Sequence, residues 1–204
     1  MKKEKLNEML KLQHELNTLI DVDWKTKERE WYRAAYLELS EAVEHFGFKW
    51  WKKTDCNKEQ AFIEVIDVIH FAMSERDELF TEDIVADNSS SSAGFVECCE
   101  YVISDLTSKR YIEDYVMYDL FDLADLLGYD SDDIFKAYVA KNVLNIFRQK
   151  NGYQDGSYIK TWKDKEDNEV LAMIMKEADS VDEIMFRLQG VYDIVKYASK
   201  YKRD

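Results

Sequence analysis

Apolar residues recur at helical spacing along most of this chain. Near the N-terminus, Leu6, Met9, Leu12 and Leu16 fall three or four residues apart, which predicts a helix from about residue 3 to residue 19. The same pattern predicts further helices from a Thr26 N-cap to Phe46, from Asp55 or Asn57 past Met73, and over residues 95–106, 111–127, 134–149 and 181–201. No segment has a convincing strand pattern. We therefore expect one all-α, bundle-like domain over residues 1–204.

Composition supports this expectation. The chain has no proline and 6 glycines, which suits helices better than a turn-rich sandwich or barrel. The stretch ADNSSSSAG, residues 86–94, is the one low-complexity segment and is predicted to be a flexible loop.

The charge and the absence of targeting signals narrow the class of function. Lys and Arg number 28 against 42 Asp and Glu, a formal net charge of -14, which argues against general binding to nucleic acid or to an anionic membrane. No apolar run approaches the ~18 residues of a membrane span, and the N-terminus lacks the apolar region of a signal peptide. The three cysteines form no C-x-x-C motif. We expect a reduced, cytoplasmic protein.

Two carboxylate pairs lie within apolar helical patterns. They are Glu38-x-x-Glu41 and Glu64-x-x-Asp67, and residues three apart project from the same face of a helix. In both pairs that face also carries apolar residues, and clustered carboxylates are costly to bury unless a cation compensates them. If the two helices pack antiparallel, the pairs face each other and form a four-carboxylate site for a hard divalent ion, with Mg²⁺ the first choice.

Other interpretations of these acids remain open. In a chain this acidic, either pair alone is also typical of a solvated helix face. His45 and His70 lie one turn beyond Glu41 and Asp67, and a mixed carboxylate and histidine site would indicate a di-iron type of bundle. The usual Glu-x-x-His spacing is approached only by Asp67 and His70, so we favour packing or supporting roles for the histidines.

A basic segment follows late in the chain. Residues 141–165 contain six basic residues and only two acids. Lys141, Asn142, Asn145 and Arg148 fall on one helical stripe, and a loop with Gly152 and Gly156 comes next. Glycine lets backbone approach an oxyanion closely, and Lys and Arg bind phosphate oxygens. An acidic metal site together with a cationic glycine loop suits a triphosphate substrate, although an ordinary basic surface patch is the alternative.

Four sequence blocks resemble the dimeric, all-α dUTPases, within the broader MazG-like nucleoside triphosphate pyrophosphohydrolases. The blocks are LQHELN (12–17), ELSEAVEHFGFKWWKK (38–53), EVIDVIHF (64–71) and KNVLNIFRQKNGYQDGSYIKTW (141–162). The carboxylate pairs are shared across the superfamily, whereas the K-N-x-x-N-x-F-R-x-x-x-G-Y block is more specific to the dUTPase branch. Residues 81–129 match nothing that we can align. The resemblance therefore implies a helical bundle of this type with a variable middle segment at about 81–129.

The resemblance also implies roles for individual residues. Glu41, Glu64 and Asp67 correspond to metal ligands, and Glu38 to a ligand or to the residue that orients the attacking water. The residues that correspond to substrate contacts are Gln13 and Asn17 at the nucleoside, Trp50 or Trp51 beside the base, Asn145 at the uracil edge, and Lys141, Arg148, Tyr153 and Lys160 at the phosphates and sugar.

We therefore expect an Mg²⁺-dependent enzyme that hydrolyses dUTP to dUMP and pyrophosphate with a metal-activated water. The expected partner is a nucleotide of the dUTP or dUDP type, and the resemblance implies a homodimer. Two alternatives remain. One is a related pyrophosphohydrolase with another substrate, such as dCTP or a modified nucleotide. The other is an acidic helical protein that binds a regulator and has no catalytic activity.

Overall fold

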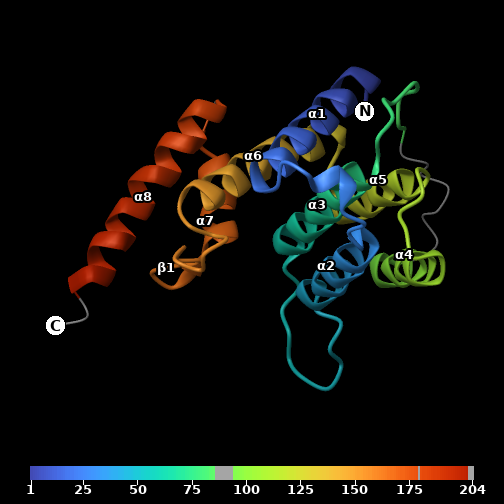
Figure 1. Ribbon diagram of the computed structural model, residues 1–204. Coiled ribbons are helices and arrows are strands. Elements are labelled where there is room, and N and C mark those ends of the chain that lie inside the picture. Colours follow the sequence, from blue (N-terminus) through green and yellow to red (C-terminus); the bar gives the residue numbers. More distant parts are fainter. Residues whose placement is uncertain (86–93, 179, 202–204) are drawn as a thin grey trace. The chain divides into compact units, whose positions relative to one another are not determined.

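The structure, a computed structural model, describes residues 1–85, 94–178 and 180–201. Within these residues the chain is mostly helical, which confirms the all-α fold class (Figure 1). The chain divides into two compact units, Met1–Tyr138 and Val139–Asp204. The loop predicted at residues 86–94 lies outside the described residues except for Gly94. No described helix is both long enough and apolar enough to cross a membrane.

The N-terminal unit is a bundle of helices. Its elements are α1 (Lys3–Ile20), the 3-10 turn η1 (Trp24–Thr26), α2 (Trp31–Phe46), α3 (Lys58–Glu75), α4 (Phe95–Lys109), α5 (Val116–Leu127) and the first part of α6 (Ser131–Lys150). Most apolar positions of the sequence pattern are buried here, including Leu6, Met9 and Leu16 of α1. The periodicity therefore located the core of this unit correctly.

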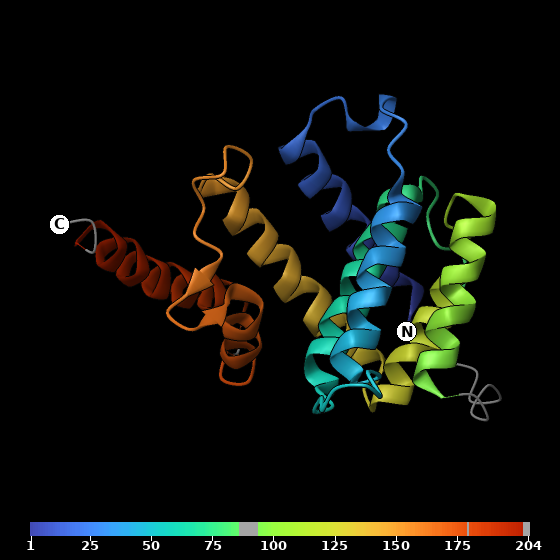
Figure 2. The same ribbon diagram turned by 90° about the horizontal axis from the view of Figure 1, so that it is seen from below.

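Helix α3 lies at the centre of the N-terminal unit. It packs against α1, α2 and α5, and α2 and α3 run side by side (Figure 2). The sequence AFIEVIDVIHFAM is apolar on nearly every face, as expected of a helix surrounded by protein. Ile66 and Ile69, for example, are fully buried. Any carboxylate on α3 therefore lies close to apolar side chains.

The ends of α2 and α3 illustrate which local signals are reliable. Asn57 caps α3 as predicted, because its Oδ1 accepts a hydrogen bond from the Gln60 N–H at 3.2 Å. Gly47 ends α2 with a φ of 93°, a conformation that favours glycine. The Thr26 N-cap was wrong, since α2 begins at Trp31 and the Thr26 hydroxyl donates to the Asp23 carbonyl at 2.8 Å.

Ion pairs account for the late start of α2. Asp21, at the end of α1, is paired with Lys27 and with Arg29, whose Nη2 lies 2.6 Å from Asp21 Oδ2. These contacts hold the chain between α1 and α2 in a non-helical path that the apolar pattern does not register. Contacts within this segment therefore accompany the failure of the Thr26 capping signal.

The start of α5 was also predicted too early. The apolar pattern suggested a helix from Tyr111, whereas α5 begins at Val116. The Arg110 φ of 64° ends α4, and Tyr115 donates to Asp105 Oδ2 at 2.6 Å. The contact with α4 therefore keeps residues 111–115 outside the helix.

The C-terminal unit is built around the second part of α6. After it come the strands β1 (Thr161–Trp162) and β2 (Lys165–Glu166), then α7 (Asp167–Met175) and α8 (Val181–Tyr201). The strands pair antiparallel, with Thr161 opposite Glu166. The core of this unit comprises, among others, Leu144, Phe147, Trp162, Leu188 and Tyr192. The range of α8 was predicted, whereas the short hairpin and α7 were not.

Candidate metal centre and nucleotide site

Three glutamates converge between α2 and α3. Glu38 and Glu41 project from α2 and Glu64 from α3, and one carboxylate oxygen of each lies within 4.8 Å of the other two. Glu64 is almost completely buried, Glu38 is half-buried and Glu41 is exposed. The group therefore extends from the protein interior to the surface, as a site open to a ligand from solvent requires.

The antiparallel arrangement of α2 and α3 produces this convergence. The Asn57 N–H, at the start of α3, donates to the carbonyl of His45, at the end of α2, at 2.8 Å. Because the two helices then run side by side, the pair three residues apart on α2 faces Glu64 on α3. Three of the four residues predicted as metal ligands therefore lie close together, and their role as ligands stays a prediction.

Asp67 and His45 flank this group. Asp67 is half-buried one turn after Glu64 and is not among the three residues whose oxygens converge. His45 Nε2 lies 3.6 Å from Glu64 Oε1, so this histidine approaches the glutamates from the α2 side. The prediction that Asp67 is a fourth metal ligand stays a prediction.

The three glutamates suit a hard divalent cation. Their donor atoms are all carboxylate oxygens, the ligands that Mg²⁺ and Ca²⁺ prefer. Opposite oxygens around such an ion lie roughly 4.2 Å apart for Mg²⁺ and roughly 5 Å apart for Ca²⁺. The observed separations of up to 4.8 Å are on this scale. The three oxygens would move closer together to bind one ion, since at most one pair among three ligands can be opposite.

Gln13 and Asn17 of α1 lie in a buried hydrogen-bond network. Gln13 Nε2 donates to Asn17 Oδ1 and to Ser74 Oγ, both at 2.9 Å, and Asn17 Nδ2 donates to Ser74 Oγ at 3.0 Å. His70 Nδ1 lies 2.6 Å from Gln13 Oε1. The Tyr138 ring stacks on His70 with centroids 3.9 Å apart. These amides therefore join α1, α3 and α6 in this structure, and His70 has the supporting role expected of it.

Trp50 lies in the loop between α2 and α3. Its side chain is 85% exposed, and its ring meets that of Trp51 edge-on, with centroids 5.6 Å apart. Trp51 in turn contacts Phe48. An exposed aromatic group beside the glutamate-bearing hairpin is chemically suited to stack on a base.

The predicted cationic stripe lies on the second part of α6, and most of it is buried. Lys141 is 1% exposed and donates through Nζ to Asn168 Oδ1 at 2.7 Å. Arg148 is 8% exposed, and its Nη1 donates to Asn145 Oδ1 at 3.1 Å. The structure therefore brings Lys141, Asn145 and Arg148 into one hydrogen-bond network, joined by Asn168.

Asp167, at the start of α7, binds Arg148 through both carboxylate oxygens. Arg148 Nε donates to Oδ2 and Nη2 to Oδ1, each at 2.8 Å, and the Tyr158 hydroxyl donates to Oδ2 at 2.7 Å. Burial alone would raise the pKa of the Asp167 carboxyl, but Arg148 and Tyr158 hold that pKa below its usual value. The carboxylate is therefore ionised at neutral pH.

The glycine loop has the backbone that its sequence suggests. Gly152 and Gly156 have φ values of 89° and 75°. The Ser157 and Tyr158 N–H groups both donate to the Gly152 carbonyl, at 3.0 and 3.1 Å, which closes a tight turn. Tyr153 is 45% exposed, and its ring lies 5.6 Å from the Arg148 guanidinium carbon. The loop thus follows the cationic stripe in the sequence, and its Tyr153 lies beside Arg148 in the structure.

Lys160 has an ion pair of its own. Its Nζ lies 3.0 Å from Glu166 Oε2, and its side chain is half exposed. Burial lowers the pKa of this ammonium, but the contact with Glu166 outweighs that effect and leaves the pKa above its usual value. Lys160 is therefore charged, as a phosphate contact requires.

Asp167 and Asn168 are the polar residues that sequence reasoning missed. They follow the last matched block by only a few residues, in the run KDKEDNEV, which gives no periodic apolar signal. One signal was available, because Glu166 and Glu169 form a capping box at the start of α7. Recognising that motif would have placed Asp167 and Asn168 in the first turn of a helix.

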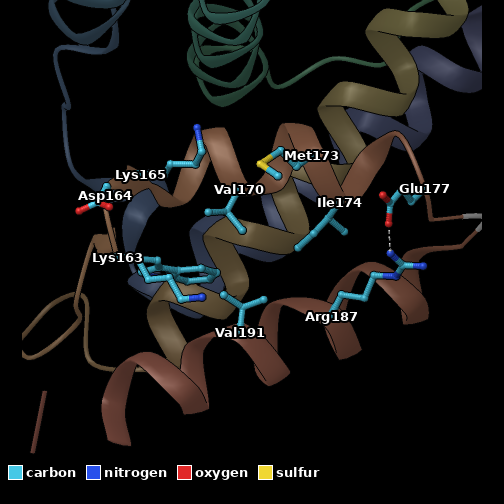
Figure 3. A pocket seen from close by; sticks show the side chains of 10 residues that line it. Lys163, Asp164, Lys165, Val170, Met173, Ile174, Glu177, Arg187 and Val191 are labelled. Atoms are coloured by element: carbon cyan, nitrogen blue, oxygen red, sulfur yellow. Dashed lines mark hydrogen bonds and ion pairs between the residues drawn. The ribbon is translucent and has the colours of Figure 1, made fainter. Parts of the chain in front are cut away.

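Two cavities lie elsewhere. One, of about 400 Å³ in the C-terminal unit, has apolar walls that include Val170, Ile174 and Val191, and the Arg187–Glu177 ion pair lies at its edge (Figure 3). The other, of about 500 Å³, lies beside α1 in the N-terminal unit. None of the predicted site residues lines either cavity.

An all-α fold that presents clustered glutamates from two neighbouring helices is typical of helical enzymes that hold a divalent cation. The comparison with protein families specifies the class further. The sequence model of a family described as dUTPase matches residues 5–153, and the chain belongs to this all-α dUTPase family. A search of curated proteins finds no match to the chain. Membership implies a nucleotide pyrophosphohydrolase that uses a divalent metal.

Proposed function

We propose that this protein hydrolyses dUTP to dUMP and pyrophosphate with Mg²⁺ as the cofactor. The observation that carries the proposal is the convergence of Glu38, Glu41 and Glu64 in a chain of the dUTPase family. A divalent ion bound there would neutralise phosphate charge and lower the pKa of a water molecule. Asp67 would complete the ligand set from the next turn of α3.

Side chains of the protein would accept the proton of the attacking water and stabilise the charge of the leaving group. Glu38, half-buried beside Glu64, is the first choice to accept the proton from the attacking water. Lys141, Arg148 and Lys160 would bind the phosphates and stabilise the charge that develops on the pyrophosphate leaving group. No covalent enzyme intermediate is required.

The remaining predicted residues would bind the nucleoside. Asn145 has an amide that can pair with the uracil edge, and its orientation is fixed by the hydrogen bond from Arg148. Gln13 and Asn17 would support the nucleoside pocket, and the exposed Trp50 would stack on the base. The proposed reaction requires residues from both compact units, and the prediction of a single domain over residues 1–204 stays a prediction.

Pyrophosphate release from a panel of nucleotides tests the proposal. Wild-type protein is assayed with dUTP, dCTP, dTTP, dATP, dGTP and UTP, in Mg²⁺ and in EDTA. Release from dUTP alone, abolished by EDTA, supports the proposal. Release from another nucleotide would retain the reaction and change the substrate. No release from any of them by folded protein would overturn the enzymatic function.

Glu41→Gln is the companion variant for this assay. It removes the charge of one glutamate at an exposed position, so folding should be little affected. We expect turnover to fall at least ~100-fold, the scale of losing one electrostatic or acid–base group. The matched control is Glu44→Gln, an exposed acid one turn further along α2 and outside the three-glutamate group. Near wild-type turnover in Glu41→Gln would exclude this metal site.

We also propose that the protein acts as a homodimer. The support is its membership of an all-α dUTPase family whose members are dimeric. Sedimentation equilibrium measures the mass directly, against 24.2 kDa for one chain. A single-chain mass at assay concentrations would refute the dimer without affecting the proposed reaction.

A further inference from the structure

The contact between Arg148 and Asp167 has the geometry of a fixed clamp. The guanidinium uses two nitrogens, Nε and Nη2, to donate to the two oxygens of one carboxylate, each at 2.8 Å. Such a paired contact fixes the plane of the guanidinium as well as its position. Lysine at position 148 could not be held in this way, because an ammonium group has no fixed fork of donors.

The clamp is buried. Asp167 is fully buried and Arg148 is 8% exposed, so neither charge can exchange its partner for water without rearrangement. The Tyr158 hydroxyl donates to Asp167 Oδ2 as a third contact. Tyr158 is itself held by stacking on Tyr192 of α8, with centroids 5.1 Å apart. The carboxylate is thus fixed from α6, from the glycine loop and, through Tyr192, from α8.

Asp167 also fixes the loop that follows the cationic stripe. Its backbone N–H donates to the Lys160 carbonyl at 3.0 Å, so the same residue holds Arg148 by its side chain and Lys160 by its main chain. Its neighbour Asn168 accepts from Lys141 Nζ at 2.7 Å and from Arg148 Nη2 at 3.0 Å. The first turn of α7 therefore contacts the cationic groups of Lys141 and Arg148 and the main-chain carbonyl of Lys160.

We propose that Asp167 is a positioning residue that orients the Arg148 guanidinium, and through it the Asn145 amide, for the nucleotide. The inference rests on the proposed function. It extends the machinery of the reaction beyond the residues that match the family, since that match ends at residue 153. Fixed donors stabilise charge that develops during the reaction better than mobile donors do, because they need no reorganisation as the reaction proceeds.

Asp167→Asn tests this role. The substitution keeps the size of the side chain but removes its charge and one acceptor for Arg148. We expect kcat/KM for dUTP to fall about 100-fold, the scale of a misplaced reacting group. Because Arg148 is assigned to the charge on the leaving group, kcat should fall more than KM rises. The control is Asp164→Asn, an exposed acid of the same segment, which should keep wild-type kinetics.

A double-mutant cycle separates positioning from a general structural effect. If Asp167 acts through Arg148, adding Asp167→Asn to Arg148→Lys should cost less than 3-fold further, or about 0.65 kcal/mol. Independent, multiplicative losses would overturn the proposal, as would wild-type kcat/KM in folded Asp167→Asn. Circular dichroism and thermal unfolding establish that each variant is folded.

Tyr158→Phe is the second variant, in case Asp167→Asn does not fold. It removes one donor to the Asp167 carboxylate and leaves Arg148 intact. We expect about a 5-fold loss in kcat, because the carboxylate loses one donor while Arg148 still holds both of its oxygens, and wild-type kcat would overturn the positioning role. If the wild-type protein hydrolyses no nucleotide, the proposed function fails and the positioning role fails with it. Hydrolysis by wild type with unaffected variants overturns the positioning role alone.

Discussion

The candidate residues of the two compact units carry charges in different environments. The glutamates of α2 and α3 range from exposed to buried, so a cation and its water shell have access to them. Arg148 and Lys141, by contrast, are buried and already hydrogen-bonded to Asp167 and Asn168. At the scale of single residues, the acids are placed to accept a ligand from solvent, and the cations are held at defined positions by protein partners.

Asn145→Ala tests how the base is recognised. A site that hydrogen-bonds one base edge rejects a mismatched edge strongly, because its own polar groups are then left unpaired. We expect KM for dUTP to rise about 10-fold or more and discrimination against dCTP to weaken. The measurement is kcat/KM for both nucleotides. Unchanged values for both would show that Asn145 does not read the base.

Asp119 provides a prediction about pH and stability. Burial, and then the nearby carboxylates of Asp122 and Asp105, raise its pKa to about 6 from the usual 3.8. Between these two pH values the folded state binds more protons than the unfolded state. The contribution of Asp119 to stability therefore declines as pH rises from 3.8 to about 6, and the folded state is penalised above that range.

Asp119→Asn removes this penalty. Because the side chain is only half-buried, solvent screening reduces the effect. We expect Tm to rise by on the order of 2 °C at pH 7.5 and not to change at pH 3.5. Thermal unfolding at both pH values is the measurement, with Asp125→Asn, exposed on the same helix, as the control. An equal gain at both pH values would exclude titration of Asp119 as the cause.

At the scale of elements, the sequence predicted what depends on periodicity and missed what depends on tertiary contacts. The apolar repeats of α1 and α3 gave their positions, and the carboxylate spacing gave three converging glutamates. The start of α2 was also missed, and the segment before it carries ion pairs from Asp21 to Lys27 and Arg29, which the apolar pattern does not indicate. The contact between Arg148 and Asp167 could not be foreseen, since it depends on a hairpin of two-residue strands that places α7 against α6.

The turn after α6 depends on glycine at position 152. With φ at 89°, an L side chain is strained there, and an added Cβ would lie 2.0 Å from Ser157 Oγ. Gly152→Ala should therefore destabilise the protein by about 1–2 kcal/mol. Gly190→Ala is the matched control, because Gly190 lies within α8 with open space around its Cβ position.

The control substitution should change the stability of the protein in the opposite direction. Alanine is favoured over glycine inside a helix, so Gly190→Ala should stabilise the protein by about 0.5–1 kcal/mol. Denaturant-induced unfolding of both variants gives the comparison. Equal stability of Gly152→Ala and the wild type would mean that the turn relaxes to accept a side chain.

At the scale of the whole molecule, the net charge of -14 destabilises the compact folded state by self-repulsion, and cations reduce this repulsion. Specific metal binding adds a separate effect, since a ligand that binds only the folded state raises the free energy of unfolding. The increase is about 2.7 kcal/mol at a concentration 100 times the dissociation constant. We therefore expect Mg²⁺ to raise Tm beyond the increase caused by NaCl at equal ionic strength.

Glu41→Gln should remove most of this additional rise while leaving the response to NaCl unchanged. The measurement is Tm against Mg²⁺ concentration for wild type and variant. The same Mg²⁺-specific rise in both proteins would place metal binding elsewhere in the chain.

The arrangement of the three glutamates on consecutive helices has a consequence during biosynthesis. Glu38, Glu41 and Glu64 all belong to one helical hairpin near the start of the chain, so the site closes through local contacts that form rapidly. Nascent chains fold from the N-terminus as they leave the ribosome. This hairpin therefore emerges while the segment with Lys141, Arg148 and Asp167 is still being translated, so the proposed metal site would form before the proposed phosphate-binding residues are present.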